Sequence, residues 1–267
     1  MKCIIRCWVG SVPIGSRERL SAVRLRVSLR EQSVLPSIEP VVLTGKISPL
    51  GPDHRPSGIA KTAVAGPWQI TRVGIVGDQQ ADLKNHGGEQ KAIHQYPFDH
   101  HAVWREDIGV HPLLGHPGSF GENLSTPSWT EQNVHVGDVV RFGSALLQVS
   151  QGRAPCWKLN ARFGVSDMAY RVQSSGRTGW YYRVLEEGIA LPGASLVLVD
   201  RSQPDWPLAR VIRLMYRDKH NYSDLRLVSE IAELTEGWRQ IARRRVEGRV
   251  VDDWSQRLGE HKSIHPA

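Results

Sequence analysis

The sequence predicts a mainly β protein, built as a barrel or sandwich of short strands with added helices and followed by a small three-helix unit. Two patterns predict this fold class. Over residues 41–204, short apolar and β-branched runs alternate with turns that contain glycine and proline. From residue 205 to 258, apolar residues recur at helical spacing instead. The length of 267 residues accommodates one large domain, or one medium domain and one small one.

Residues 1–40 differ in composition from the rest of the chain. They contain scattered Arg, Ser and Pro, and Arg6 and Pro13 interrupt the only apolar run, so we do not expect a secretory signal. An organellar transit peptide fits the Arg-rich composition. We favour a disordered extension or a coding start placed too early, with the folded part beginning near Val41. Residues 259–267 are expected to form a tail.

The first half of the β part is expected to begin with a strand over residues 41–47 that ends at Ser48-Pro49. A polar loop over residues 52–56 precedes a second strand over residues 58–65. Two more strands are expected over residues 68–73 and 92–96. A helix of about ten residues should then begin at Pro97, because proline suits the first turn of a helix.

The second half of the β part contains a predicted hairpin, in which Gly143-Ser144 joins strands over residues 139–142 and 145–150. Two further strands are expected over residues 180–185 and 195–199. Together these elements complete a sheet with few helices.

The predicted C-terminal unit contains three helices. The first carries four apolar residues at helical spacing, Leu208, Val211, Ile212 and Met215. Ser223-Asp224 should cap the second, whose apolar positions are Leu227, Ile231 and Leu234. The third covers residues 237–246. Its Arg243-Arg244-Arg245 run is compatible with a helix-turn-helix DNA reader, but we favour a solvated basic face.

The net charge of +7 and the isoelectric point near 9.5 are not spread evenly. Residues 41–200 contain equal numbers of acidic and basic side chains, so the basic excess lies in the two ends. Phosphate binding requires a basic face on the folded part, so we do not expect nucleic acid as a partner. Because no apolar run reaches 18 residues, no membrane span is expected. Three cysteines (Cys3, Cys7 and Cys156) cannot form a disulfide scaffold, which favours the cytoplasm.

Cys156 is the first candidate functional residue. Arg153 precedes it by three residues and Lys158 follows it by two, and such cations stabilise a thiolate. A thiolate is a nucleophile and a ligand for soft or thiophilic metals. The alternative is a buried, inert cysteine.

Two other polar, glycine-bearing segments are candidates for ligand contacts. In His86-Gly87-Gly88, the glycines permit positive φ and close backbone approach to a ligand, although a hairpin turn explains them equally well. In Gly121-Glu122-Asn123, the amide could pair with the edge of a heterocycle, or the segment could be a simple turn. A zinc site formed by His86, His94, His100 or His101 lacks a recognised spacing and is disfavoured.

Together, in this order, the motifs H-G-G at residues 86–88, F-G-E-N-L at 120–124 and S-Q-G-R-A-P-C-W-K-L at 150–159 resemble the MOSC domain, the molybdenum-cofactor sulfurase C-terminal domain. They are most similar to its YiiM-type branch, which has a C-terminal three-helix extension. The resemblance implies a MOSC β-barrel related to the pyruvate-kinase barrel domain. It also implies a bound molybdopterin cofactor with Cys156 as the molybdenum ligand.

Further expectations follow from that resemblance. Arg153, Lys158 and Lys91 would meet the cofactor phosphate. Contacts to the edge of the pterin ring would come from His86, the backbone of Gly87 and Gly88, and Asn123. Glu122 is also expected to bind the cofactor. The aminotransferase-like half of the eukaryotic cofactor sulfurases is missing from this chain, so no pyridoxal phosphate is expected.

The resemblance also implies a function, the reduction of N-hydroxylated purine bases or related N-oxygenated compounds. Because the sequence contains no flavin, nicotinamide or iron–sulfur motif, electrons would come from a separate reductase. Two alternatives stay open: a non-catalytic carrier that holds sulfur or cofactor on the Cys156 thiolate, and a nucleic-acid-binding module.

Overall fold

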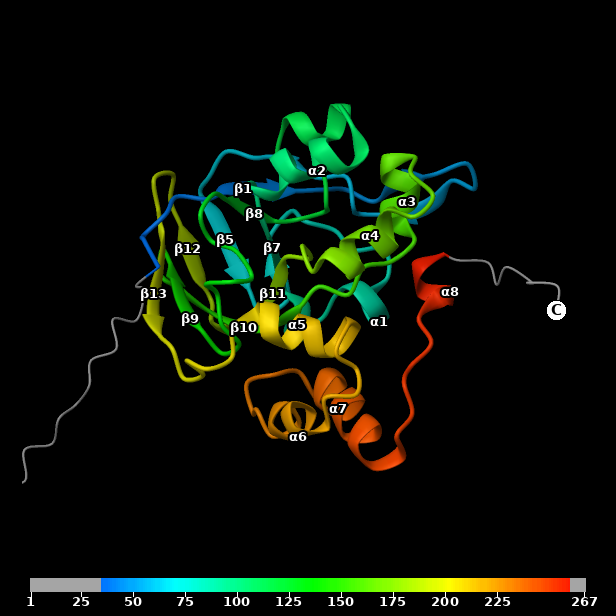
Figure 1. Ribbon diagram of the computed structural model, residues 1–267. Helices are drawn as coiled ribbons and strands as arrows, with labels where there is room; N and C mark the ends of the chain where they lie inside the picture. Colours follow the sequence, from blue (N-terminus) through cyan, green and yellow to red (C-terminus); the bar gives the residue numbers. More distant parts are fainter. Residues whose placement is uncertain (1–34, 260–267) are drawn as a thin grey trace, which may run out of the picture. The chain divides into compact units, whose positions relative to one another are not determined.

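The computed structural model describes residues 35–259 (Figure 1). Most of the predicted N-terminal extension and all but the first residue of the predicted tail lie outside these residues. The strands are β1 (Val41–Thr44), β2 (Ser48–Leu50), β3 (Arg55–Ser57), β4 (Thr62–Ala63), β5 (Trp68–Thr71), β6 (Gly74–Ile75), β7 (Ile93–Pro97), β8 (Leu124–Thr126), β9 (Val139–Phe142), β10 (Ala145–Gly152), β11 (Trp180–Glu186), β12 (Gly188–Ala190) and β13 (Leu196–Asp200). The helices are α1 (Leu83–His86), η1 (Glu89–Lys91), α2 (His100–Ile108), η2 (Pro112–Gly115), α3 (Lys158–Phe163), α4 (Met168–Ser175), α5 (Leu208–Tyr216), α6 (Tyr222–Ser229), α7 (Glu236–Gly248) and α8 (Ser255–Leu258).

The main sheet is mixed and has eight strands in the order β13-β9-β10-β11-β7-β8-β1-β4. It curls into a half-barrel, and all its pairs are antiparallel except β7 with β8. A parallel pair needs a crossover connection, which here contains α2 and η2. Two small sheets, β12-β5-β6 and β2-β3, accompany it. The structure therefore confirms the predicted mainly β class with added helices.

Several predicted element boundaries were wrong. The helix expected at Pro97 begins at His100, because Pro97 still pairs with Thr126 at the end of β7. Residues 48–50, expected to end a strand, form β2, and the predicted polar loop after them contributes β3. The strand expected over residues 58–65 shrinks to the two residues of β4. Helices α3 and α4 were not predicted at all.

Residues 35–40, which we assigned to the N-terminal extension, lie against the sheet. Leu35 is buried, and Ile38 exchanges backbone hydrogen bonds with Leu196 of β13. The Trp129 indole also donates to the Pro36 carbonyl at 2.9 Å. The folded body therefore begins before Val41.

The C-terminal region contains the three predicted helices, α5 to α7, with one corrected cap. Asn221 caps α6 by accepting from the Asp224 amide, whereas Ser223-Asp224 had been expected to do so. Leu227 is exposed, so the apolar face of α6 is formed instead by Leu225 and Val228.

The basic run of α7 is largely compensated by carboxylates. Arg243 pairs with Glu236, and Arg244 pairs with Asp252. The third arginine, Arg245, is buried rather than solvated and donates to the Leu214 carbonyl at 3.1 Å. The expected solvated face therefore describes only the first two arginines.

Helix α5 lies beside β10 (Figure 1), and its buried side chains join those of the sheet in one apolar cluster. A second cluster lies under α2, α3 and α4 and includes Tyr96, Phe120 and Leu159. Within residues 35–259, no helix combines the length and apolar character needed to cross a lipid bilayer.

Candidate functional site

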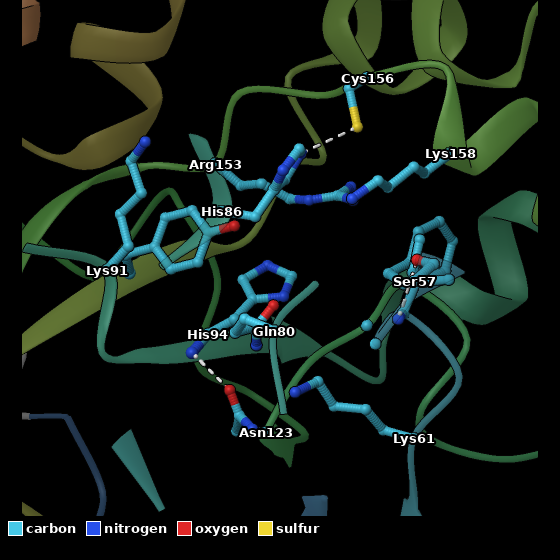
Figure 2. A pocket seen from close by; sticks show the side chains of 15 residues that line it. Ser57, Lys61, Gln80, His86, Lys91, His94, Asn123, Arg153, Cys156 and Lys158 are labelled. Carbon is cyan, nitrogen blue, oxygen red and sulfur yellow. Dashed lines mark hydrogen bonds between the residues drawn. The ribbon is translucent and has the colours of Figure 1, made fainter. Parts of the chain in front are cut away.

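A pocket with about 470 Å³ of empty space, part of it open to solvent, lies where the loop after β10 faces α1, η1 and the strand β7 (Figure 2). Six of the predicted site residues line it: His86, Lys91, Asn123, Arg153, Cys156 and Lys158. These six residues therefore converge, although they come from three separate segments of the chain.

The loop after β10 brings three of these side chains together. The Arg153 amide donates to the Gly179 carbonyl at 3.0 Å, which extends the β10–β11 ladder by one residue. The chain then turns through Cys156, and α3 begins at Lys158. Arg153, Cys156 and Lys158 are 5%, 4% and 8% exposed, so all three are buried at the wall of the pocket.

His86 connects α1 to the cysteine. Its Nε2 lies 3.3 Å from the Cys156 Sγ (Figure 2), and its Nδ1 lies 3.2 Å from an Asp82 carboxylate oxygen. Burial and the positive charges of Lys158 and Arg153 lower the pKa of His86 to about 4, against the opposing effect of Asp82. The imidazole is therefore neutral at pH 7.

Two buried polar atoms at the pocket have no hydrogen-bond partner among residues 35–259: Arg153 Nη1 and His94 Nε2. His94 lies on β7 directly opposite Tyr181 of β11, with ring centroids 5.1 Å apart. Burial, followed by the charge of Arg153, lowers the pKa of His94. Because a buried polar atom without a partner costs roughly 1–3 kcal/mol, these two atoms indicate a place for a ligand.

Asn123 belongs to a buried polar network beneath the pocket. Its Nδ2 donates to Asp78 at 2.9 Å and to the Leu43 carbonyl at 3.3 Å, and its Oδ1 accepts from the His94 amide at 3.1 Å. Asp78 also forms an ion pair with Lys61, and burial lowers the pKa of Lys61 against the opposing effect of Asp78. The Asn123 amide therefore fixes neighbouring elements in addition to lining the pocket.

Glu122, Gly87 and Gly88 do not line the pocket. The fully buried Glu122 carboxylate accepts from the amides of Gly118 and Phe120 at 2.6 and 2.9 Å, so it shapes the loop behind the site. Gly88 has φ of 87° and precedes η1, a conformation that favours glycine.

The pocket is cationic. Lys61, Lys91, Arg153 and Lys158 line it, and no Asp or Glu is among its lining residues in the described part of the chain. Lys61 is paired with Asp78 and Lys91 has interactions of its own, so Arg153 and Lys158 are the clearest candidates for an anion.

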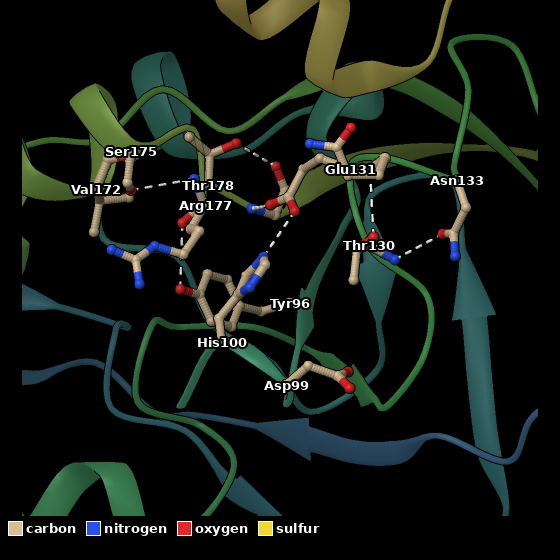
Figure 3. Close-up of polar contacts among 12 residues, drawn as sticks. Tyr96, Asp99, His100, Thr130, Glu131, Asn133, Val172, Ser175, Arg177 and Thr178 are labelled. Atoms are coloured by element: carbon tan, nitrogen blue, oxygen red, sulfur yellow. Dashed lines mark hydrogen bonds and ion pairs between the residues drawn. The ribbon is translucent and has the colours of Figure 1, made fainter. Parts of the chain in front are cut away.

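The other histidines considered for zinc lie elsewhere. His100 Nε2 lies 2.7 Å from the Glu131 carboxylate, whose other oxygen accepts from the Gly179 amide (Figure 3). His101 is buried among aromatic rings, and its ring centroid lies 4.6 Å from that of Phe98. Across residues 35–259, no group of three or more His, Cys, Asp or Glu side chains could hold a metal ion.

Sequence reasoning missed five polar residues of the pocket: Ser57, Lys61, Gln80, His94 as a pocket residue, and Tyr181. His94 and Tyr181 occupy strands with no glycine-rich motif beside them, so only the pairing of β7 with β11 brings them to the site. Asp78 lies within the segment that precedes His86, but its link to Lys61 depends on the fold.

Comparisons with known proteins add independent findings. A family model for the MOSC domain matches residues 82–197, and one for a YiiM-like, 3-alpha helix domain matches residues 206–249. Protein YiiM of Escherichia coli (strain K12) is 38% identical over 218 residues, which cover 81% of this chain and 96% of that protein. The crystal structure of YiiM from Escherichia coli superimposes with a TM-score of 0.71 at 31% identity, covering 84% of this chain and 98% of that one.

A third relative carries a functional name. A protein of Gibberella moniliformis (strain M3125 / FGSC 7600) named "Reductase" is 36% identical over 193 residues. The match covers 71% of this chain but 34% of that protein.

Proposed function

Because the chain belongs to the MOSC family and carries a YiiM-like three-α-helix domain, we propose that its pocket binds a molybdenum–pterin cofactor. We further propose that the protein reduces N-hydroxylated purine bases or related N-oxygenated compounds. The observation that carries the proposal is the convergence of the Cys156 thiol with the unpaired Arg153 Nη1 in a cationic pocket.

The residues present fit such a cofactor. A thiolate is a suitable ligand for a thiophilic metal, and Cys156 is held at the pocket wall. A pterin cofactor carries a phosphate, for which Arg153 and Lys158 offer charge-assisted hydrogen bonds. The buried His94 ring lines the pocket and offers a polar contact to a heterocycle.

When bound, the cofactor would supply the two-electron redox chemistry that this chain's own side chains lack. The protein's part is to bind and orient. Arg153 and Lys158 hold the anionic end, Cys156 provides the ligand sulfur, and His86 holds the Cys156 side chain in position. In the overall reaction the N–O bond breaks, two electrons and two protons are taken up, and the amine and water leave. A separate reductase in the same compartment, which we expect to be the cytoplasm, would supply the electrons.

The test is to purify the full chain, measure molybdenum and pterin per protein, and assay an N-hydroxylated purine with a chemically reduced viologen as electron donor. Stoichiometric molybdenum and turnover are expected for the wild type, and both should be lost in Cys156→Ser. Protein that is free of molybdenum and inactive after expression in a cofactor-producing host would contradict the proposal.

One contact favours a second candidate, a non-catalytic carrier of sulfur or cofactor. The His86 ring nitrogen lies 3.3 Å from the Cys156 sulfur, an arrangement that also suits a thiol that takes the outer sulfur of a donor protein's persulfide, the donor leaving as a thiol. Mass spectrometry of the intact protein distinguishes the two functions. A persulfide on Cys156 without molybdenum would support the carrier.

A further inference from the structure

The last described segment, Trp254 to Gly259, leaves the helical region and returns to the loop that carries Cys156. Figure 1 shows α8 separated from α7 and placed toward α3 and α4. The segment follows residues 206–249, where the match to the three-helix family model ends. Residues 254–259 themselves lie outside both family matches.

Two hydrogen bonds join the segment to the cysteine loop. The amide of Trp157, the residue after Cys156, donates to the Arg257 carbonyl at 2.8 Å. The side-chain amide of Asn160 donates to the Leu258 carbonyl at 2.8 Å. Asn160 also accepts from the Ala169 amide at 2.7 Å, so one side chain connects α3, α4 and α8.

Side-chain packing anchors the same segment at both ends. Leu258 is 4% exposed and belongs to the apolar cluster that contains Leu159 of α3. Arg257 donates to Gln173 of α4 at 2.6 Å, and its guanidinium lies 4.2 Å from the centroid of the Trp254 ring. The Trp254 ring in turn contacts Tyr216 of α5 edge-on, with centroids 4.7 Å apart.

Gly259 lets the backbone of this segment lie directly against Trp157. Its φ is 81°, and a Cβ on this residue would lie 2.9 Å from the Trp157 Cβ. The backbone therefore approaches the tryptophan more closely than any residue with a side chain would allow.

We propose that residues 254–259 act as a strap that holds the Cys156 loop in its binding conformation, with Arg257 and Leu258 as positioning residues. Without the strap, the Trp157 amide and the Asn160 side chain lose hydrogen-bond partners, and an apolar gap opens beside Leu159. The loop would then open locally more often, and Cys156 and Lys158 would leave the pocket wall. The identity of the bound group rests on the proposed function, but the strap itself does not.

The test uses cofactor-free full-length protein and the rate at which iodoacetamide alkylates Cys156. Peptide-resolved mass spectrometry reads Cys156 separately from Cys3 and Cys7. Arg257→Ala and Leu258→Ala should each speed the alkylation by about tenfold, which corresponds to about 1.4 kcal/mol of local opening free energy. The matched controls, Arg226→Ala and Leu227→Ala on exposed positions of α6, should leave the rate unchanged.

Hydrogen exchange distinguishes a strap from general stabilisation. Amides of residues 154–160 should lose protection in both variants, while those of β10 and β11 should keep it. Unchanged alkylation in both variants, or equal loss of protection throughout the sheet, would overturn the proposal. Faster alkylation in a protein that never contains molybdenum would support the strap and contradict the proposed function.

Discussion

Replacing Arg153 with methionine should separate binding from stability. The Arg153 guanidinium is buried, and its Nη1 has no hydrogen-bond partner within residues 35–259. Such an atom costs roughly 1–3 kcal/mol, which offsets the contacts that methionine would lose. The free energy of unfolding of cofactor-free protein should therefore stay within about 1 kcal/mol of the wild type. If Arg153 holds the cofactor phosphate, one charge-assisted bond of about 1.5–3 kcal/mol disappears, and cofactor affinity falls roughly ten- to hundredfold.

The assay pairs urea unfolding of cofactor-free protein with pterin content after dialysis of loaded protein. Arg245 provides the matched control, because it is equally buried but bonds to the Leu214 carbonyl and to Asp252. Arg245→Met should lower the free energy of unfolding by about 1–3 kcal/mol, since the Leu214 carbonyl stays buried without a partner. Cofactor content should then be little changed. If Arg153→Met destabilises as much as Arg245→Met and retains the pterin, Arg153 is a structural residue.

Four other changes have defined outcomes. Cys156→Ser should abolish molybdenum binding while the free energy of unfolding changes by only about 1 kcal/mol; elemental analysis showing bound molybdenum would rule out the sulfur ligand. Asp78→Ala should lower the free energy of unfolding in urea by about 3–5 kcal/mol, because Lys61 stays buried without its carboxylate partner. An unchanged free energy of unfolding would show that water reaches the pair. Leu35→Ala should lower the free energy of unfolding by about 2–5 kcal/mol, as expected for a buried leucine. An unchanged free energy of unfolding would show that residues 35–40 belong to the extension and not to the folded body. Burial lowers the pKa of His101 to about 4, so the unfolded chain binds the extra proton between pH 4 and 6.5 and stability rises with pH there. His101→Phe should reduce that slope by up to about 1.4 kcal/mol per pH unit, and an unchanged slope would contradict the assignment.

Local patterns in the sequence predicted the elements whose cause is local. The hairpin around Gly143-Ser144 has its turn residues beside two apolar runs, and its strands lie within two residues of the expected positions. Helix α5 likewise follows from its apolar spacing. By contrast, Pro97 was expected to start a helix because the sequence does not reveal that β8 pairs with β7 up to this residue.

The sequence also does not reveal which strands bring residues together at the site. Cys156, Arg153 and Lys158 are neighbours in the chain, so the sequence alone grouped them, and all three line one pocket. His94 could not be assigned to the pocket, because its place depends on the register of β7 with β11. Glu122 was expected to bind the ligand, but its carboxylate accepts hydrogen bonds from amides of the loop behind the pocket. A short motif does not show whether a carboxylate binds a ligand or the protein's own backbone.

The shared core has a consequence for how the chain unfolds. The two family matches meet between residues 197 and 206, yet the apolar cluster continues across that junction from Val149 of β10 to Ile212 of α5. Thr235 adds hydrogen bonds to Ser150 and Gln151, so polar contacts cross the same boundary. Cutting the chain there would expose apolar faces on both fragments. The half-barrel and the helices should therefore melt in one cooperative transition, as a single folding unit assembled from two families of sequence.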